Sequence, residues 1–421
     1  MATEGPFLAA IIARLPDPTV NLAAYGVAFA LAILIEAPVI MLMSASTSLV
    51  RDRVTYLKLR NFARFLGVAT TGLLLAVLIP SVYRWLTGTV LGLPPEVADL
   101  TYGALWFFLP WPAAIAYRRF LQGVLIRAGK TRLVAWGTLI RLFGMVIAAL
   151  AGFFVLDLPG AWVGGLALGT GVTVEAIAAR FMAASSVRNL LEGKGDLEAR
   201  GRNVTYRDIA KFYFPLALTS FIGLSIQPLL TFFMGRSIAP LESLAVFPVV
   251  HALSFFFRSM GLALQDTAIA LMGERFTHLP ELKKFALGLG LATSTGLALV
   301  AFTPLSRLWF ETVSGLTSEL ASFALTPTQV IVPLPFLAVL LSLQRAILVE
   351  GRKTHYITVA SALEVGCVAV LFILLGFRLD LVGATAAFGA FMGARLVSVS
   401  YLLVRCRSVL RDAPASTPRG A

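Results

Sequence analysis

Long apolar runs recur along the whole of this 421-residue chain, and each is about as long as a helix that crosses a lipid bilayer. In lipid the backbone must satisfy its own hydrogen bonds, so continuous runs of this length predict α-helices rather than barrel strands. Charged residues make up 14% of the chain and its mean hydropathy is +0.85, whereas soluble domains carry about 25% charged residues. The sequence therefore predicts an all-α polytopic membrane protein. The predicted spans are 23–49, 62–86, 97–126, 133–156, 160–186, 208–235, 241–272, 285–310, 320–350, 354–377 and 381–404, with a short apolar segment at 5–14.

Positive charge alternates between the two sets of connections that join these spans. Of the 35 Lys and Arg residues, 23 lie in every second connection or in the C-terminal tail. Because Lys and Arg are retained on the cytoplasmic side, this alternation predicts a multi-pass protein of the cell (inner or cytoplasmic) membrane with a cytoplasmic C-terminus. It also accounts for the formal net charge of +13, so no nucleic-acid partner is expected.

The two halves of the chain resemble each other. Residues 6–26, PFLAAIIARLPDPTVNLAAYG, align without a gap with residues 228–248, PLLTFFMGRSIAPLESLAVFP, at an offset of 222. Farther along, Pro110-Trp111-Pro112 aligns with Pro333-Leu334-Pro335. Matched prolines and turn residues in one order indicate a duplication into two parallel six-helix repeats, an arrangement that is known among membrane proteins. The expected organisation is an N-lobe at 1–186, a cytoplasmic linker at 187–206, a C-lobe at 207–408 and a cytoplasmic tail at 409–421.

The first repeat is expected to begin with a helix like that at 211–235, most of which has no counterpart near the N-terminus. A start codon assigned too late is the favoured explanation, because a short apolar stub leaves helix ends unsatisfied in lipid. A protein that works with the stub is the alternative.

Charged side chains inside the predicted spans are the candidate functional residues. Each costs about 2.5 kcal/mol or more near the bilayer centre, so it must face a protein interior, a partner or water. The arginines there are Arg118, Arg119, Arg141, Arg180, Arg258, Arg345 and Arg395, and the acids are Glu36, Glu175, Asp266 and Glu364. Because arginine suits bidentate capture of carboxylate or phosphate, this positive excess favours a polar cavity for an anionic solute.

The repeat reverses the sign of the charge at two positions. Glu36 is equivalent to Arg258, and Arg141 is equivalent to Glu364. Opposite charges at equivalent positions predict a gate of ion pairs between the lobes. The alternative is that each charge pairs within its own lobe and serves stability.

Two groups of polar residues are the candidates for the cavity. His251, Arg258 and Gln265 are spaced by seven and share one helical stripe. Arg118, Arg119 and Gln122 form a second group at a depth equivalent to Gln344 and Arg345, although Arg118 and Arg119 have the alternative of snorkelling to the interface. The predicted substrate-binding residues are Arg118, Arg141, Arg258, Gln265, Gln344, Arg345, Arg395 and His251, and the gate or coupling candidates are Glu36, Asp266, Glu364 and Glu175.

No cofactor, metal or catalytic site is predicted. The segment GVLIRAGKT at 123–131 looks like a phosphate-binding loop, but five residues separate its glycines and an apolar helix precedes it. The histidines are too scattered for a metal site. We expect a transporter without enzymatic activity.

AAYGVAFAL at 23–31, FPLALTSF at 214–221 and QPLLTFFMGRS at 227–237 resemble the MATE-like branch of the multidrug/oligosaccharidyl-lipid/polysaccharide exporter superfamily. Arg51-Asp52-Arg53 and PLPFLAVLLSLQRAILVEGRKT at 333–354 are similar to the progressive ankylosis family, which exports pyrophosphate and organic anions. The resemblance implies two lobes that rock to give alternating access, an exporter or antiporter in the lipid bilayer, and a small anionic or phosphate-bearing solute. Coupling to a proton or to sodium is left open.

The sequence departs from MATE drug exporters, which have an acidic cation site in the first or seventh helix. The span 208–235 has no acid beyond Asp208 at its edge. A flippase for lipid-linked oligosaccharide or polysaccharide and a cation-coupled multidrug exporter remain alternatives, as does a non-transport scaffold.

Overall fold

The computed structural model describes residues 3–192, 205–272, 276–351 and 353–412, and over these residues it forms helices and no strand. Within this part of the chain, eight helices are long and apolar enough to cross a membrane, or up to ten if each of two bent pairs counts as one span. The prediction of an all-α polytopic protein is confirmed. The chain is a multi-pass membrane protein.

The chain divides into two compact units. The first unit runs from Ile11 to Phe232, and the second holds the start of α1 up to Ala10 together with the chain from Phe233 onward. The helices up to the end of the first unit are α1 (Glu4–Ile12), α2 (Pro18–Glu36), η1 (Ala37–Val39), α3 (Leu42–Leu49), α4 (Arg53–Val77), α5 (Pro80–Arg84), η2 (Trp85–Leu91), α6 (Pro95–Phe107), α7 (Trp111–Arg127), α8 (Thr131–Phe154), α9 (Gly160–Met182), α10 (Ala184–Leu191), α11 (Tyr206–Leu224) and α12 (Ile226–Met234). Those that follow are α13 (Pro240–Leu271), α14 (Leu279–Phe302), α15 (Leu305–Arg307), η5 (Leu308–Val313), α16 (Ser318–Val330), α17 (Leu334–Glu350), α18 (His355–Phe372), η6 (Ile373–Arg378) and α19 (Gly383–Asp412).

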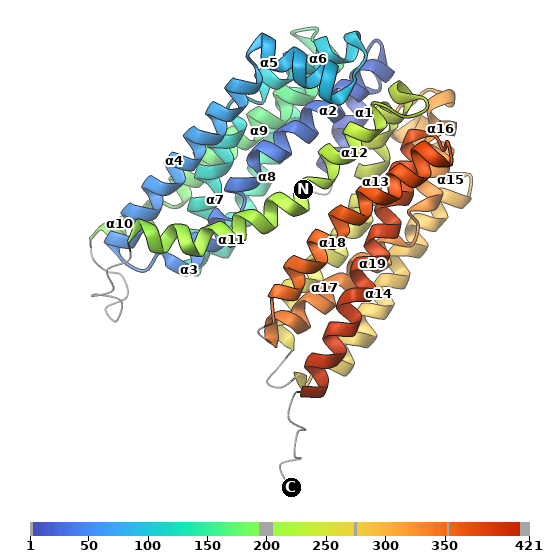
Figure 1. Ribbon diagram of the computed structural model, residues 1–421. Helices are drawn as coiled ribbons and strands as arrows, with labels where there is room; N and C mark the ends of the chain where they lie inside the picture. Colours follow the sequence, from blue (N-terminus) through green and yellow to red (C-terminus); the bar gives the residue numbers. More distant parts are fainter. Residues whose placement is uncertain (1–2, 193–204, 273–275, 352, 413–421) are drawn as a thin grey trace. The chain divides into compact units, whose positions relative to one another are not determined.

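Long helices run side by side within the first unit, with α5 and α6 at one end and α3 and α10 at the other (Figure 1). The face of α8 that carries Phe143, Ile147 and Phe154 is exposed. In a membrane protein such a face is solvated by lipid tails, because they are as apolar as the side chains themselves. The opposite faces of these helices pack together and bury the polar residues described below.

Several predicted spans are broken at prolines. The predicted span 97–126 is two helices, α6 and α7, because Pro110 precedes α7 and Pro112 occupies its first turn, where a missing backbone N–H costs nothing. Its counterpart in the second half, α16 and α17, bends by 41°. The predicted span 23–49 is likewise interrupted, at η1, which contains Pro38.

The repeat is visible helix by helix. The π-helical turn η2 recurs as η5, and the residues that follow them, Gly92 and Gly315, both have positive φ. Asp17 and Ala239, which precede α2 and α13, also share a positive φ, at 49° and 52°. Left-handed backbone is uncommon for residues other than glycine, so its recurrence at matched positions supports the duplication independently of residue identity.

One buried hydrogen bond is repeated as well. The side-chain oxygen of Asn21 on α2 accepts a bond of 2.9 Å from the backbone N–H of Ala161, at the start of α9. In the second unit the hydroxyl of Ser243 on α13 accepts a bond of 3.0 Å from Ala384, at the start of α19. Each bond satisfies one of the free N–H groups of a helix N-terminus. The two halves therefore share a side-chain cap at the equivalent helix end.

The boundary of the units differs from the expected organisation at α11. The repeat predicts that this helix belongs to the second lobe, whereas in the structure it packs on the first unit. The reason is a set of contacts with η1 and α4: the Tyr213 hydroxyl donates to the Pro38 carbonyl, and its ring meets Phe62 edge to face at 5.2 Å. The start of α1 packs on the second unit instead, where a Cβ on Gly5 would lie 3.0 Å from that of Ala252. The predicted linker and tail lie largely outside the described residues.

Candidate functional site

A buried ionic cluster lies between α7, α8 and α9 of the first unit, centred on the carboxylate of Glu175. This side chain is fully buried and accepts hydrogen bonds from Arg118 at 2.7 Å and Gln122 at 3.0 Å. The Arg141 Nε lies 3.4 Å from the same carboxylate. Both oxygens of Glu175 therefore have charged or amide partners, which is what a buried carboxylate needs to remain in the membrane.

Small residues bring these helices close enough for the pairs to form. A Cβ on Gly171 would lie 3.1 Å from the Arg141 carbonyl oxygen, and one on Gly137 would lie 3.5 Å from a Glu175 oxygen. Close backbone approach through small residues is the usual way in which membrane helices pack. The cluster is thus built into the α8–α9 contact.

Glu36 lies at the end of α2 and belongs to the same cluster. It is 6% exposed and accepts a hydrogen bond from the indole N–H of Trp111, and its charged neighbours are Arg118, Arg119 and Arg141. With Glu175 this gives three arginines and two carboxylates. The formal charge of the cluster is one positive.

The second unit contains a corresponding cluster on α13, α17, α18 and α19. Arg395 and Glu364 form an ion pair of 2.8 Å, and both are charged neighbours of Arg258 and Arg345. Three arginines here face one carboxylate, so the formal charge is two positive. Arg258 is 9% exposed, and its Nη1 has no hydrogen-bond partner among the described residues.

Phe391 joins two of these arginines. The guanidinium carbons of Arg258 and Arg395 each lie 5.2 Å from the centre of its ring. A cation over an aromatic face is attracted to the ring. One buried side chain of α19 therefore contacts cations from two helices.

The remaining predicted residues have varied surroundings. The Gln344 amide donates to the Val399 carbonyl at 3.0 Å and so ties α17 to α19. His251 stacks on Phe255 and lies at a tilt to the ring of Phe247 along α13, whereas Gln265 is half-buried. Asp266 belongs to α13, but its side chain lies outside the described residues.

The predicted gate pairs remain a prediction. The described ion pairs of Arg141 and Glu364 are made within their own units, with Glu175 and Arg395. This is the alternative arrangement in which charges stabilise each lobe internally. Arg180 differs from the other predicted arginines because it is exposed.

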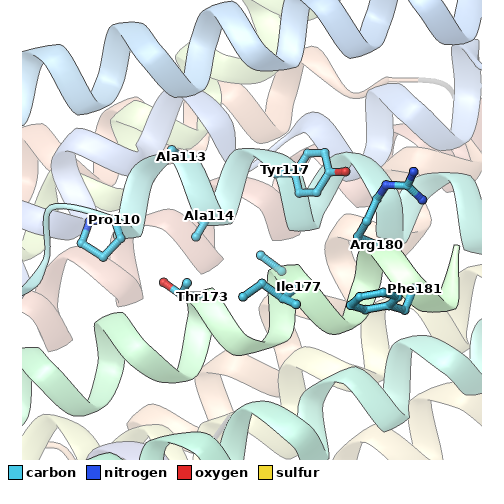
Figure 2. A pocket seen from close by; sticks show the side chains of 9 residues that line it. Pro110, Ala113, Ala114, Tyr117, Thr173, Ile177, Arg180 and Phe181 are labelled. Carbon is cyan, nitrogen blue, oxygen red and sulfur yellow. The ribbon is translucent and has the colours of Figure 1, made fainter. Parts of the chain in front are cut away.

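A groove of about 470 Å³ lies between α7 and α9 of the first unit (Figure 2). Small residues line its middle, and Tyr117, Arg180 and Phe181 lie toward one end. Its volume is in the range of ligand pockets. The arginines of the two clusters, unlike Arg180, are not among its lining residues.

Solved structures with the same architecture exist at low sequence identity. A multidrug resistance MATE family transporter of the MOP superfamily, in an inward-facing conformation, aligns over 99% of this chain and 96% of its own, with 16% identity and a TM-score of 0.75. The lipid II flippase MurJ, in an inward closed conformation, aligns over 96% of this chain and 85% of its own, with 16% identity and a TM-score of 0.71. The chain has the MATE transporter fold.

A third structure with the MATE transporter fold is a MOP superfamily transporter from Pyrococcus furiosus, at 12% identity and a TM-score of 0.58 over 99% of this chain and 96% of that one. No family model and no curated protein matches the sequence. The resemblance to the MATE-like branch is therefore confirmed at the level of the fold. Closeness to the progressive ankylosis family stays a prediction.

Two residues that complete these clusters carry no charge and are not among the predicted site residues. They are Trp111, which is part of the repeated Pro-x-Pro segment, and Phe391. Both are aromatic residues in a chain that is 11% aromatic, so neither ring is distinctive by composition. A useful indicator for Phe391 is its position four residues before Arg395, on the same face of α19.

Proposed function

We propose that this protein is a secondary transporter that carries an anionic solute across the membrane by alternating access of its two lobes. The observation that carries the proposal is the cluster of the second unit, where Arg258, Arg345 and Arg395 face the single carboxylate of Glu364. Uncompensated charge inside a membrane protein is expensive and marks substrate or ion pathways. A bound anion would supply the missing negative charge.

The structures of similar fold support a transport function. Two are a MATE family transporter and a flippase. The Pyrococcus furiosus transporter is described as having a binding pocket of reverse polarity, which suggests a different function for that protein. In this chain an arginine-rich cluster on the MATE fold favours an anion over the cationic drugs of multidrug exporters, because guanidinium groups attract negative charge. Catalysis is not part of the proposal.

A flippase for a lipid-linked, phosphate-bearing substrate is the second candidate. It is favoured by the similarity to MurJ, a lipid II flippase, over 96% of this chain. Its substrate would also be anionic, so the buried arginines are compatible with both functions. Coupling to a proton or to sodium is left open in each case.

Anion flux into liposomes that contain the purified full chain tests the proposal. Arg258→Gln removes a buried guanidinium, and we expect flux of organic and inorganic phosphate to fall at least tenfold. Arg84→Gln is the matched control, because Arg84 is exposed at the end of α5. Equal flux through Arg258→Gln and wild-type protein, with both folded, would reject the assignment of this cluster.

A further inference from the structure

The three arginines of the second unit are not equivalent in their contacts. Arg395 is paired with Glu364 at 2.8 Å, whereas Arg258 makes no ion pair among the described residues and is buried with Nη1 unsatisfied. An unpaired charge in this position is costly unless something compensates it. The guanidinium of Arg258 instead contacts the ring of Phe391.

Phe391 limits how far apart the two guanidinium groups lie. Because each guanidinium carbon is 5.2 Å from the ring centre, the two cations are separated by no more than twice that distance. Like charges within this distance repel each other in a medium of low polarity. The ring holds them together, since both are attracted to the same π-system.

The first repeat lacks every part of this arrangement. At the offset of 223 that aligns Pro110 with Pro333, Phe391 corresponds to Leu168 and Arg395 to Val172. At the offset of 222 that holds nearer the start of the repeat, Arg258 corresponds to Glu36. The carboxylate of Glu175 is instead already bound by Arg118, Gln122 and Arg141. The first cluster therefore has one positive charge in excess, whereas the second has two.

We propose that Phe391 is a positioning residue that holds Arg258 and Arg395 as a clamp for an oxyanion with two negative charges, of the phosphate monoester class. Glu364 remains paired with Arg395 until the oxyanion takes the place of the Glu364 carboxylate. This inference rests on the proposed function, because it names the substrate class and the lobe of the same anion site. Two guanidinium forks suit the several oxygens of a phosphate, and a dianion neutralises the excess of two charges.

Binding of inorganic phosphate to the purified full chain in detergent at pH 8 tests the clamp. Radiolabelled phosphate is the probe, and methyl phosphate and dimethyl phosphate are the competitors. Methyl phosphate has two negative charges at this pH because its second ionisation lies near pH 6, whereas dimethyl phosphate has one. We expect methyl phosphate to compete at least tenfold better.

Three variants separate positioning from packing. Phe391→Leu removes the ring and should lower phosphate affinity at least tenfold. It should also reduce the preference for methyl phosphate over dimethyl phosphate. Phe391→Tyr keeps the ring and should bind within threefold of wild type. Phe388→Leu is the matched control on the same helix, because Phe388 is also buried and stacks on Phe247 at 5.1 Å rather than on an arginine. It should lose stability without losing affinity.

The outcomes distinguish this inference from the proposed function. If phosphate binds but methyl and dimethyl phosphate compete equally, or if Phe391→Leu binds phosphate as Phe388→Leu does, the clamp is refuted while anion transport stands. If the wild-type protein neither binds phosphate nor carries any anion, the proposed function fails and the clamp fails with it. Loss of affinity in Phe391→Leu with recovery in Phe391→Tyr supports the clamp.

Discussion

Glu175→Gln removes the charge around which the first unit is organised, and its cost follows from the contacts of that carboxylate. Glu175 is fully buried, and its partners Arg118 and Arg141 are 2% and 5% exposed. An amide at this position has no charge to offset two desolvated guanidinium groups. Removing one partner of a buried ion pair costs about 3–5 kcal/mol, so we expect a marked fall in the unfolding temperature.

Replacement of Glu175 together with its direct partners should be less harmful. A variant with Glu175→Leu, Arg118→Met, Arg141→Met and Gln122→Leu removes these charges, the amide and their desolvation cost together, and it leaves Glu36 with Arg119 and Trp111. Buried ion pairs exchanged for apolar side chains of similar volume are often neutral or stabilising. We therefore expect this variant to unfold at a higher temperature than Glu175→Gln, although it differs from wild type at more positions.

The measurement is the fraction of monodisperse full-length protein that remains in detergent after heating. Glu311→Gln is the control, because Glu311 is exposed on η5 and the same change of charge should leave stability within about 0.5 kcal/mol of wild type. Two results would refute the electrostatic argument for the cluster. One is a Glu175→Gln variant that unfolds at the same temperature as wild type, and the other is a fourfold variant that unfolds at a lower temperature than Glu175→Gln.

Two further predictions concern packing and topology. Gly103→Ala places a Cβ 2.2 Å from the Trp162 ring, which is held by a hydrogen bond of 3.1 Å to the Leu100 carbonyl, so we expect the free energy of unfolding to fall by about 1–3 kcal/mol. Gly72→Ala in α4 meets nothing within 4 Å and should raise the free energy of unfolding by about 0.5–1 kcal/mol. Heat denaturation of both variants tests this, and a higher melting temperature for Gly103→Ala than for Gly72→Ala contradicts it. Cysteines introduced at Arg84 and Arg307 should react with an impermeant thiol reagent from outside intact cells. A reporter fused after Ala421 should be active in the cytoplasm. If either cysteine is labelled only after lysis, the predicted topology is wrong.

Hydropathy and the repeat predict most of the fold, because the apolar requirement of a membrane acts on each helix separately. Every predicted span corresponds to helix in the structure. The breaks were harder to predict: Pro110 could kink a continuous helix or end one, and the structure shows that it separates α6 from α7. The packing of α11 on the first unit depends on single contacts of Tyr213, which no periodicity encodes.

The candidate site was predictable in its residues and not in its pairings. Charge inside an apolar span identifies Arg118, Arg141 and Glu175 without any structure, since each must be compensated. Which charges meet depends on the rotation of each helix, and Arg118 and Glu175 are 57 residues apart in the chain. The hypothesis of a gate between the lobes took its pairs from the symmetry of the repeat. The described ion pair of Arg141 is with Glu175 on the next helix of its own unit, and the gate remains a prediction.

The two clusters differ in formal charge, although an exact repeat would make their charges equal. An exact duplication would give both units the same polar cluster, with the same formal charge. Glutamate at position 36 and arginine at position 258 shift charge from the first cluster to the second, whereas arginine at 141 and glutamate at 364 shift it back. The remaining imbalance comes from residues outside this exchange, above all from Glu175, which has serine, Ser398, at the equivalent position of the second repeat. Without a carboxylate at this position the second cluster has a formal charge of two positive, whereas the first has one, and the proposal of an anion site in the second unit rests on this difference.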